Sequence, residues 1–167
     1  MKMGSSMALL KENALERLKS AWNAGRFAHA YLLDGPGGSG KEWLATELAS
    51  FVLEVPAGEV PAHPDYHSVG PESKSRRIVI EQMRTMEQAL QMKPMRGRTK
   101  VAVIHDADRL QPPAANAFLK TLEEPPPGCH IFLLTSLPDA IMDTIISRCI
   151  AVPLRAAGEV PKTEGER

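Results

Sequence analysis

The segment from Ala30 to Leu53 constrains the fold more than any other part of the sequence. A short apolar run, Ala30–Leu33, leads into a glycine-rich stretch and then into the helical pattern of residues 41–53. The stretch matches the spacing G-x-x-x-x-G-K and consists of Gly35, Pro36, Gly37, Gly38, Ser39, Gly40, Lys41 and Glu42. Glycines let backbone N–H groups turn inward around a phosphate, while a helix N-terminus and a lysine add positive charge. The pattern predicts a phosphate-binding loop between a buried strand and a helix.

Apolar runs and helical patterns alternate along the rest of the chain. Further buried strands are expected at Val101–Ile104, Ile131–Leu134 and Ile150–Val152. Helices are expected over residues 7–24, 80–92 and 112–123, and the prolines that open the last of these suit a first turn. Continuous apolar strands separated by helices indicate a parallel sheet covered on both faces, and therefore an α/β fold.

Two positions depart from the pattern of an active ATPase. A working loop ends in Ser or Thr, whose hydroxyl holds Mg²⁺, but Glu42 stands there. Its carboxylate could ligate Mg²⁺ or could repel the phosphates, and the sequence leaves both alternatives open. The next strand would end in Asp for the metal and Glu to activate water, and His105 and Asp106 occupy these positions. Shifting the alignment by one makes Asp106 the metal residue and leaves Ala107 as the base, a role that alanine lacks. The departures predict that efficient ATP hydrolysis is lost.

Charge and cysteine content exclude several classes of protein. The 20 Lys and Arg residues balance 20 Asp and Glu, which argues against a free-standing electrostatic DNA binder. Two cysteines, Cys129 and Cys149, make neither a disulfide framework nor a four-thiolate zinc site, and they fit a reducing, cytoplasmic location.

No apolar stretch is long enough to span a membrane. The basic run Lys93–Lys100 has two readings, a solvated loop or a contact for DNA or an acidic neighbour.

The segment Ala114–Pro126, AANAFLKTLEEPP, is the most specific motif in the chain. Other motifs accompany it in order: His29–Leu32, His63–Asp65, Ile78–Arg84 and Ser147–Cys149. Together they resemble the motifs of bacterial DNA polymerase III clamp-loader subunits, gamma/tau and delta-prime, in the AAA+ superfamily. The resemblance extends over residues 6–155. It implies a P-loop NTPase (AAA+) core, with a five-stranded parallel sheet flanked by helices.

The resemblance also implies a place in the ring of subunits that loads the sliding clamp onto primed DNA. The neighbours would be gamma/tau and delta subunits, with the sliding clamp and primer-template DNA as indirect partners. Within the family gamma/tau is the ATPase, whereas delta-prime often has broken nucleotide motifs and serves as a stator. The departures at Glu42 and His105 therefore favour the delta-prime branch.

Individual residues gain roles from the same resemblance. Arg148 would act in trans as an arginine finger toward a neighbouring subunit's ATP. Thr135, or Ser136 beside it, would sense the γ-phosphate, although a hydroxyl at a strand end is also commonplace. ATP or ADP stays a candidate ligand of the loop. No zinc or other metal is expected, because the four-cysteine module of many relatives is replaced by the cysteine-free stretch Leu53–Ala62.

The expected organisation is one AAA+ domain over residues 1–155, with residues 1–5 flexible and 156–167 a linker-like tail. The lid and collar domains of relatives lie outside this chain, so it is either a piece of a longer protein, which we expect, or an unusually short relative. Two alternatives stay open. One is a gamma/tau-like active ATPase, in which Glu42 and Asp106 rebuild a metal site. The other is an unrelated P-loop kinase, against which the Ala114–Pro126 segment argues.

Overall fold

The computed structural model describes residues 7–72 and 74–159, and its central sheet is parallel throughout. The strands lie in the order β2-β3-β4-β1-β5. Their bounds are β1 (Ala30–Asp34), β2 (Tyr66–Val69), β3 (Lys100–Ile104), β4 (Cys129–Thr135) and β5 (Ile150–Pro153). The five-stranded parallel sheet implied by the resemblance is therefore confirmed.

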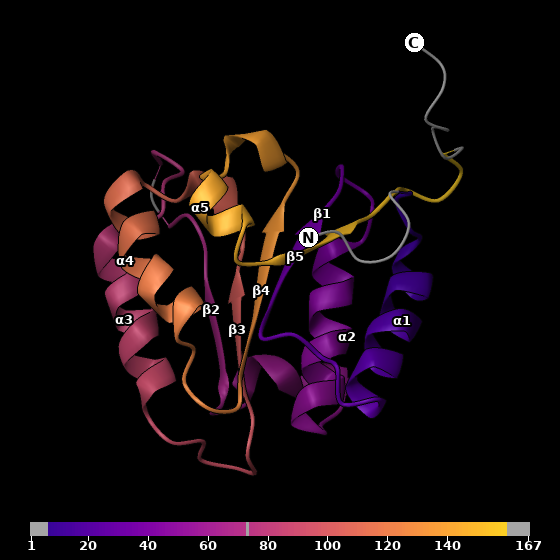
Figure 1. Cartoon of the computed structure of the whole chain (residues 1–167), viewed down its shortest axis with the longest axis horizontal. Coiled ribbons are helices and arrows are strands. Elements are labelled where there is room, and N and C mark those ends of the chain that lie inside the picture. Colours follow the sequence, from indigo (N-terminus) through magenta and orange to yellow (C-terminus); the bar gives the residue numbers. More distant parts are fainter. Residues whose placement is uncertain (1–6, 73, 160–167) are drawn as a thin grey trace.

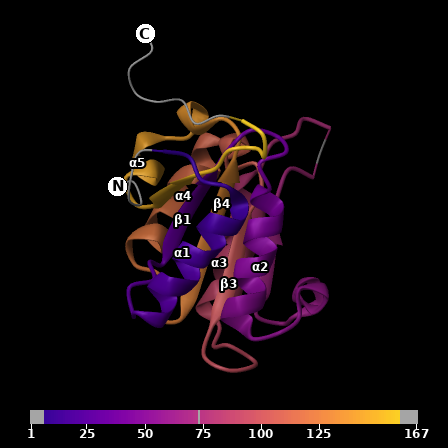
Figure 2. The same ribbon diagram turned by 90° about the vertical axis from the view of Figure 1, so that its right-hand side faces the viewer.

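Helices cover both faces of the sheet, as Figure 1 shows. On one face lie α1 (Lys11–Asn23) and α2 (Lys41–Leu53), which Figure 2 places toward the viewer, and on the other lie α3 (Ile80–Gln91) and α4 (Pro112–Glu123). The short elements are α5 (Asp143–Ile146) and the 3-10 helices η1 (Ala57–Ala62), η2 (Ala107–Arg109) and η3 (Pro138–Ala140). The first helix begins later than the sequence predicts, because Leu9 pairs with Leu154 as an isolated bridge.

Apolar strand residues divide between two cores. Leu32 packs with Phe118 in the core beneath α3 and α4. Its neighbour Leu33 points to the other face and packs with Leu48 and Phe132 beneath α1 and α2. Successive side chains of a strand point to opposite faces, so a strand covered by helices on both sides needs an unbroken apolar run. This is why the apolar runs predicted β1, β3 and β4 correctly.

Strand β2 is the one that the apolar pattern did not reveal. It lies at an edge of the sheet and pairs only with β3. Among its four residues only Val69 is buried. Its sequence, YHSV, has no continuous apolar run, and three of its four positions are at least partly exposed. The resemblance implied a fifth strand, and the structure places it at Tyr66–Val69.

The segment between α3 and β3 is held in place by Asp65. This residue is fully buried. Its Oδ1 accepts the backbone N–H of Met95 and its Oδ2 accepts that of Arg96, each at 2.7 Å. The backbone N–H of Asp65 in turn donates to Nδ1 of His63, at 3.0 Å. The His63–Asp65 motif thus acts structurally, fastening a loop at the end of the sheet opposite the glycine loop.

Lys100 corrects the expectation for the basic run Lys93–Lys100. It opens β3 and is buried, so it belongs to neither a solvated loop nor a contact surface. Its ammonium group donates to the carbonyl of Ala89 at 2.6 Å and to that of Met92. Carbonyls at the end of a helix lack intrahelical partners and attract a cation. The exposed cations of the run are Lys93, Arg96 and Arg98.

The expectations for the chain ends fall partly outside the described residues. The flexible segment 1–5 lies outside them, as do residues 160–167 of the expected tail. Residues 156–159 form a turn, in which the N–H of Glu159 donates to the carbonyl of Ala156 at 3.3 Å. Within residues 7–72 and 74–159, no helix has the length and apolar character needed to cross a membrane.

Candidate functional site

The predicted nucleotide-site residues lie together at the edge of the sheet that is formed by the carboxyl ends of its strands. The glycine loop follows β1, His105 follows β3, and Thr135 ends β4. In an open parallel sheet, ligands bind at this edge. It lies at the top of Figure 1, where the glycine loop leads into α2.

The glycine loop is closed by its own backbone and by tight packing. The N–H of Ser39 donates to the carbonyl of Pro36 at 3.1 Å. A Cβ atom on Gly35 would lie 2.6 Å from Oγ of Ser39 and 2.9 Å from the carbonyl oxygen of Leu154, so only glycine fits there. Gly40 has a φ of 87°, a conformation that favours glycine, and α2 begins at the next residue. The loop geometry predicted from the sequence is therefore present.

Lys41 turns toward the loop's own carbonyl oxygens. Its Nζ donates to the carbonyl of Gly35 at 2.6 Å and to that of Pro36 at 3.2 Å. The hydroxyl of Ser39 is buried and has no hydrogen-bond partner among the described residues. These two contacts occupy two of the three donors of the Lys41 ammonium group and leave the third for another acceptor.

The two residues that depart from the ATPase pattern contact each other. Oε2 of Glu42 lies 2.7 Å from Nδ1 of His105. The hydrogen bond with Glu42 raises the pKa of His105, and the same bond lowers the pKa of Glu42. The exposed Asp106 carboxylate adds to the rise in the pKa of His105. Sequence reasoning treated these positions as separate defects, whereas the structure makes them one ion pair.

The side chains at this edge differ from those that hold Mg²⁺ in an ATPase of this fold. Glu42 and His105 stand at the motif positions that supply metal ligands in an ATPase. Mg²⁺ prefers an octahedron of oxygen ligands, but His105 offers nitrogen and occupies the Glu42 carboxylate. Within residues 7–72 and 74–159, no group of three or more His, Cys, Asp or Glu side chains is arranged to hold a metal ion. A metal site rebuilt from Glu42 and Asp106 stays a prediction.

Thr135 is buried, and its hydroxyl is used inside the protein. Its Oγ1 donates to Oδ1 of Asp108 at 2.7 Å and accepts the backbone N–H of Leu137 at 2.9 Å. The side chain of Asp108 is only 7% exposed and lies 3.6 Å from Nε of Arg109. Sequence reasoning did not single out Asp108, because nothing in its spacing marks it. The sensor role of Thr135 stays a prediction.

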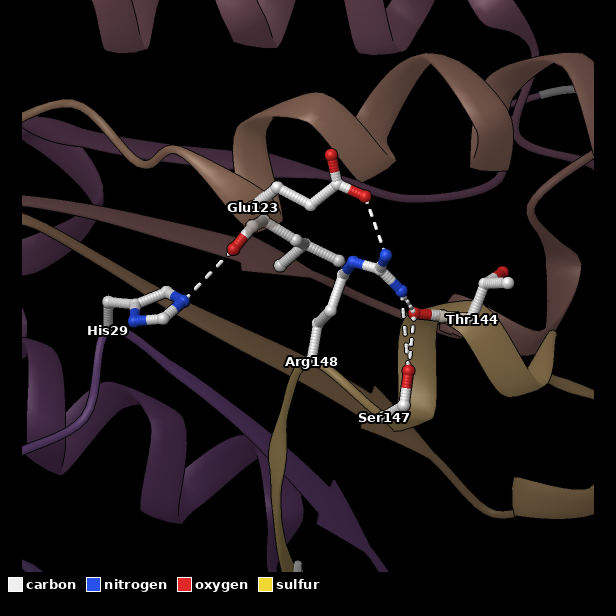
Figure 3. Close-up of polar contacts among 6 residues, drawn as sticks. His29, Glu123, Thr144, Ser147 and Arg148 are labelled. Atoms are coloured by element: carbon white, nitrogen blue, oxygen red, sulfur yellow. Dashed lines mark hydrogen bonds and ion pairs between the residues drawn. The ribbon is translucent and has the colours of Figure 1, made fainter.

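Arg148 follows α5, and Figure 3 shows its partners. Its Nη2 lies 2.6 Å from Oε1 of Glu123, the last residue of α4. Its Nη1 donates to the carbonyl of Thr144 at 2.6 Å and to Oγ of Ser147 at 3.3 Å. The Arg148 side chain remains 32% exposed. The guanidinium group is therefore held from two sides and still open to solvent.

Three of the sequence motifs meet around Arg148. Nε2 of His29 lies 3.0 Å from the carbonyl oxygen of Leu122, next to Glu123 in the chain, as Figure 3 also shows. Cys149, the residue after Arg148, is buried, and burial raises the pKa of its thiol to about 12. Cys149 is thus a packing residue. Sequence reasoning missed Glu123 as a partner of Arg148, although both lie in motifs that it had singled out.

Known proteins resemble this chain over most of its length. The family described as "DNA polymerase III, delta subunit" matches residues 10–157. The DNA polymerase III subunit delta' of Escherichia coli is 33% identical over 148 residues, covering 80% of this chain and 44% of that protein. The delta' subunit of Pseudomonas aeruginosa is 37% identical over 146 residues, covering 78% and 44%. The tau subunit of E. coli is 32% identical over 160 residues, covering 87% and 24%.

Two solved structures of Thermotoga maritima proteins share the fold of this chain. A DNA polymerase III gamma subunit-related protein of Thermotoga maritima has a TM-score of 0.68 and 28% identity, covering 92% of this chain and 47% of that one. The RuvB Holliday junction branch migration motor of T. maritima, with a TM-score of 0.60 and 19% identity, covers 86% and 44% and shows the fold alone. This chain spans less than half the length of these relatives. It has the AAA+ P-loop NTPase fold, and it belongs to the DNA polymerase III delta-prime subunit family.

Proposed function

We propose that this chain is the AAA+ domain of a clamp-loader stator that acts in DNA replication. In this proposal the AAA+ domain comprises residues 1–155, and residues 156–167 are a linker-like tail. The domain binds neighbouring gamma/tau and delta subunits in the cytoplasm, and it meets the sliding clamp and primer-template DNA only through them. It supplies Arg148 to a neighbouring subunit's ATP and hydrolyses none itself. The names of the relatives support the setting in replication.

The ion pair between Glu42 and His105 is the observation that carries the proposal. An ATPase of this fold needs a hydroxyl and a carboxylate at these positions to hold Mg²⁺ beside the phosphates. Here the two side chains lie 2.7 Å apart and satisfy each other. Lys41 likewise contacts carbonyls of its own loop. The glycine loop thus keeps its shape, which serves the fold, without the groups that cleave ATP.

Arg148 supports the second half of the proposal. An arginine finger stabilises negative charge that develops on the transferred phosphoryl group, and it does so from a neighbouring subunit. Such a residue must be fixed at its base and accessible at its tip. Arg148 lies two residues after the end of the short helix α5, contacts Thr144 and Ser147, and keeps part of its side chain exposed.

The alternative of an active, gamma/tau-like ATPase draws on the tau subunits among the relatives. Steady-state ATP hydrolysis separates the two. The full-length protein is assayed alone, and then assembled with its gamma/tau and delta subunits, clamp and primed DNA. We expect negligible turnover alone. In the assembly, Arg148→Ala should lower turnover without unfolding the chain, whereas Arg84→Ala, which removes an exposed arginine on α3, should not.

Two results would contradict the proposal. Substantial turnover by the isolated protein, abolished by Lys41→Ala, would make it an active ATPase. An intact assembly with unchanged turnover after Arg148→Ala would remove the arginine-finger role.

A further inference from the structure

Glu123 is the acidic partner of Arg148, and the two side chains come from different elements of the fold. Their closest atoms, Nη2 of Arg148 and Oε1 of Glu123, are 2.6 Å apart. We propose that Glu123 is a positioning residue, which fixes the direction in which Arg148 presents its guanidinium group to a neighbouring subunit's phosphate. This inference rests on the function proposed above for Arg148.

The placement of Glu123 is unfavourable for its own helix. It is the last residue of α4, where unsatisfied carbonyls make the helix end negative and favour cations. Lys120 is the basic residue of that last turn and suits it. A carboxylate at the end gains nothing from the helix, so its presence calls for another partner. The Arg148 guanidinium group is that partner, and Figure 3 shows the carboxylate directed at it.

The hydrogen bonds of Arg148 leave some of the N–H donors of its guanidinium group available. A guanidinium group carries five N–H donors in one plane. Nη1 donates to the carbonyl of Thr144 and to Oγ of Ser147, and Nη2 donates to Glu123. Within residues 7–72 and 74–159, these three contacts leave Nε–H and one Nη2–H for an incoming oxygen. Because Nη1 contacts Thr144 of α5 and Nη2 contacts Glu123 at the end of α4, two separate elements hold the guanidinium group.

Fixing this plane matters more for rate than for stability. A displacement of about 1 Å from the reacting geometry lowers a catalysed rate about 100-fold. An ion pair this exposed stabilises a fold very little. Loss of Glu123 should therefore leave the folded protein as stable as before and lower turnover at the ATP site that Arg148 serves.

The test uses the full-length protein assembled with its gamma/tau and delta subunits, clamp and primed DNA. The variants are Glu123→Ala, Glu123→Gln, Arg148→Ala and, as a matched control, Glu124→Ala, which removes the adjacent exposed glutamate. The readouts are kcat and KM for ATP and the thermal midpoint of each variant. We expect Glu123→Ala to reproduce most of the fall in kcat caused by Arg148→Ala, with unchanged KM and midpoint. Glu123→Gln should restore most of kcat, because its amide oxygen still accepts from Nη2, and Glu124→Ala should behave as the unaltered protein.

The outcomes separate this inference from the proposed function. If Arg148→Ala leaves turnover unchanged, the arginine-finger function itself fails. If Arg148→Ala lowers turnover but Glu123→Ala does not, only the positioning role is overturned. A rise in kcat for Glu123→Ala would show that Glu123 restrains Arg148. If Glu123→Gln were as slow as Glu123→Ala, the hydrogen bond from Nη2 would not be what positions Arg148. Either result overturns the inference.

Discussion

Replacing Asp65 with alanine is expected to free the segment between α3 and β3 and to destabilise the whole domain. The Asp65 carboxylate is fully buried and accepts the backbone N–H groups of Met95 and Arg96, each at 2.7 Å. Its own backbone carbonyl accepts the N–H of Val101 at 2.9 Å, a bond that the substitution leaves in place. The change therefore removes the side-chain contribution alone.

The size of the effect follows from the two lost bonds. A hydrogen bond to a charged group contributes about 1.5–3 kcal/mol. The lower figure applies here, because Met95 is 78% exposed and the freed N–H groups can reach water once the loop opens. Two such bonds amount to about 3 kcal/mol. In a domain of this size, each kcal/mol lowers the thermal midpoint by about 2–4 °C, so the expected fall is about 6–12 °C.

Thermal unfolding followed by circular dichroism measures the global effect, and amide hydrogen exchange measures the local one. We expect the amides of Met95 and Arg96 to lose protection in Asp65→Ala before the amides of β3 do. Asp65→Asn keeps one acceptor oxygen but turns an NH2 group toward the second backbone N–H, so it should lose at least half as much stability as Asp65→Ala. A midpoint within about 1 °C of the unaltered protein, with both loop amides still protected, would refute the reasoning.

Three further predictions concern other parts of the molecule. Glu42 raises the pKa of His105. The pair therefore stabilises the fold fully at pH values below the ordinary histidine pKa of about 6.5, provided that Glu42 is ionised. This contribution is lost as the pH rises through the raised pKa of His105. In urea unfolding, His105→Ala should therefore lower the free energy of unfolding by at most about 1 kcal/mol at pH 5.5, since Glu42 is 65% exposed, and by less at pH 8.5. A larger loss at pH 8.5 than at pH 5.5 would contradict the expected direction of the pH dependence. Cys149, with a thiol pKa of about 12, should react with iodoacetamide at pH 8 only after unfolding in urea, and mass spectrometry of the folded protein should find it unmodified. Phe118→Ala, which empties a fully buried position beneath α4, should cost about 3–5 kcal/mol in urea unfolding, and a loss below about 1 kcal/mol would show that the site collapses around the smaller side chain.

The sequence predicted the elements whose signals are local. The bounds of α2 and α4 agree with the structure, because a glycine loop begins one helix and two prolines begin the other. The apolar runs in β1, β3 and β4 follow from burial on both faces. The loop Gly35–Lys41 could be located for the same reason, since its conformation depends on glycines adjacent in the chain. Lys100 shows the limit of such reading, because its ammonium group contacts carbonyls at the end of α3 that only the fold brings beside it.

By itself, then, the sequence determined the parallel α/β class, the family motifs and the glycine loop. Tertiary structure alone decided what those motifs touch. The strand order brings His105, after β3, to Glu42, at the start of α2, and turns two departures from an ATPase into one ion pair. Packing of α5 against the end of α4 likewise brings Arg148 to Glu123. Side-chain pairs between segments far apart in the chain depend on how the sheet orders its strands, and no local period of apolar or charged residues encodes that order.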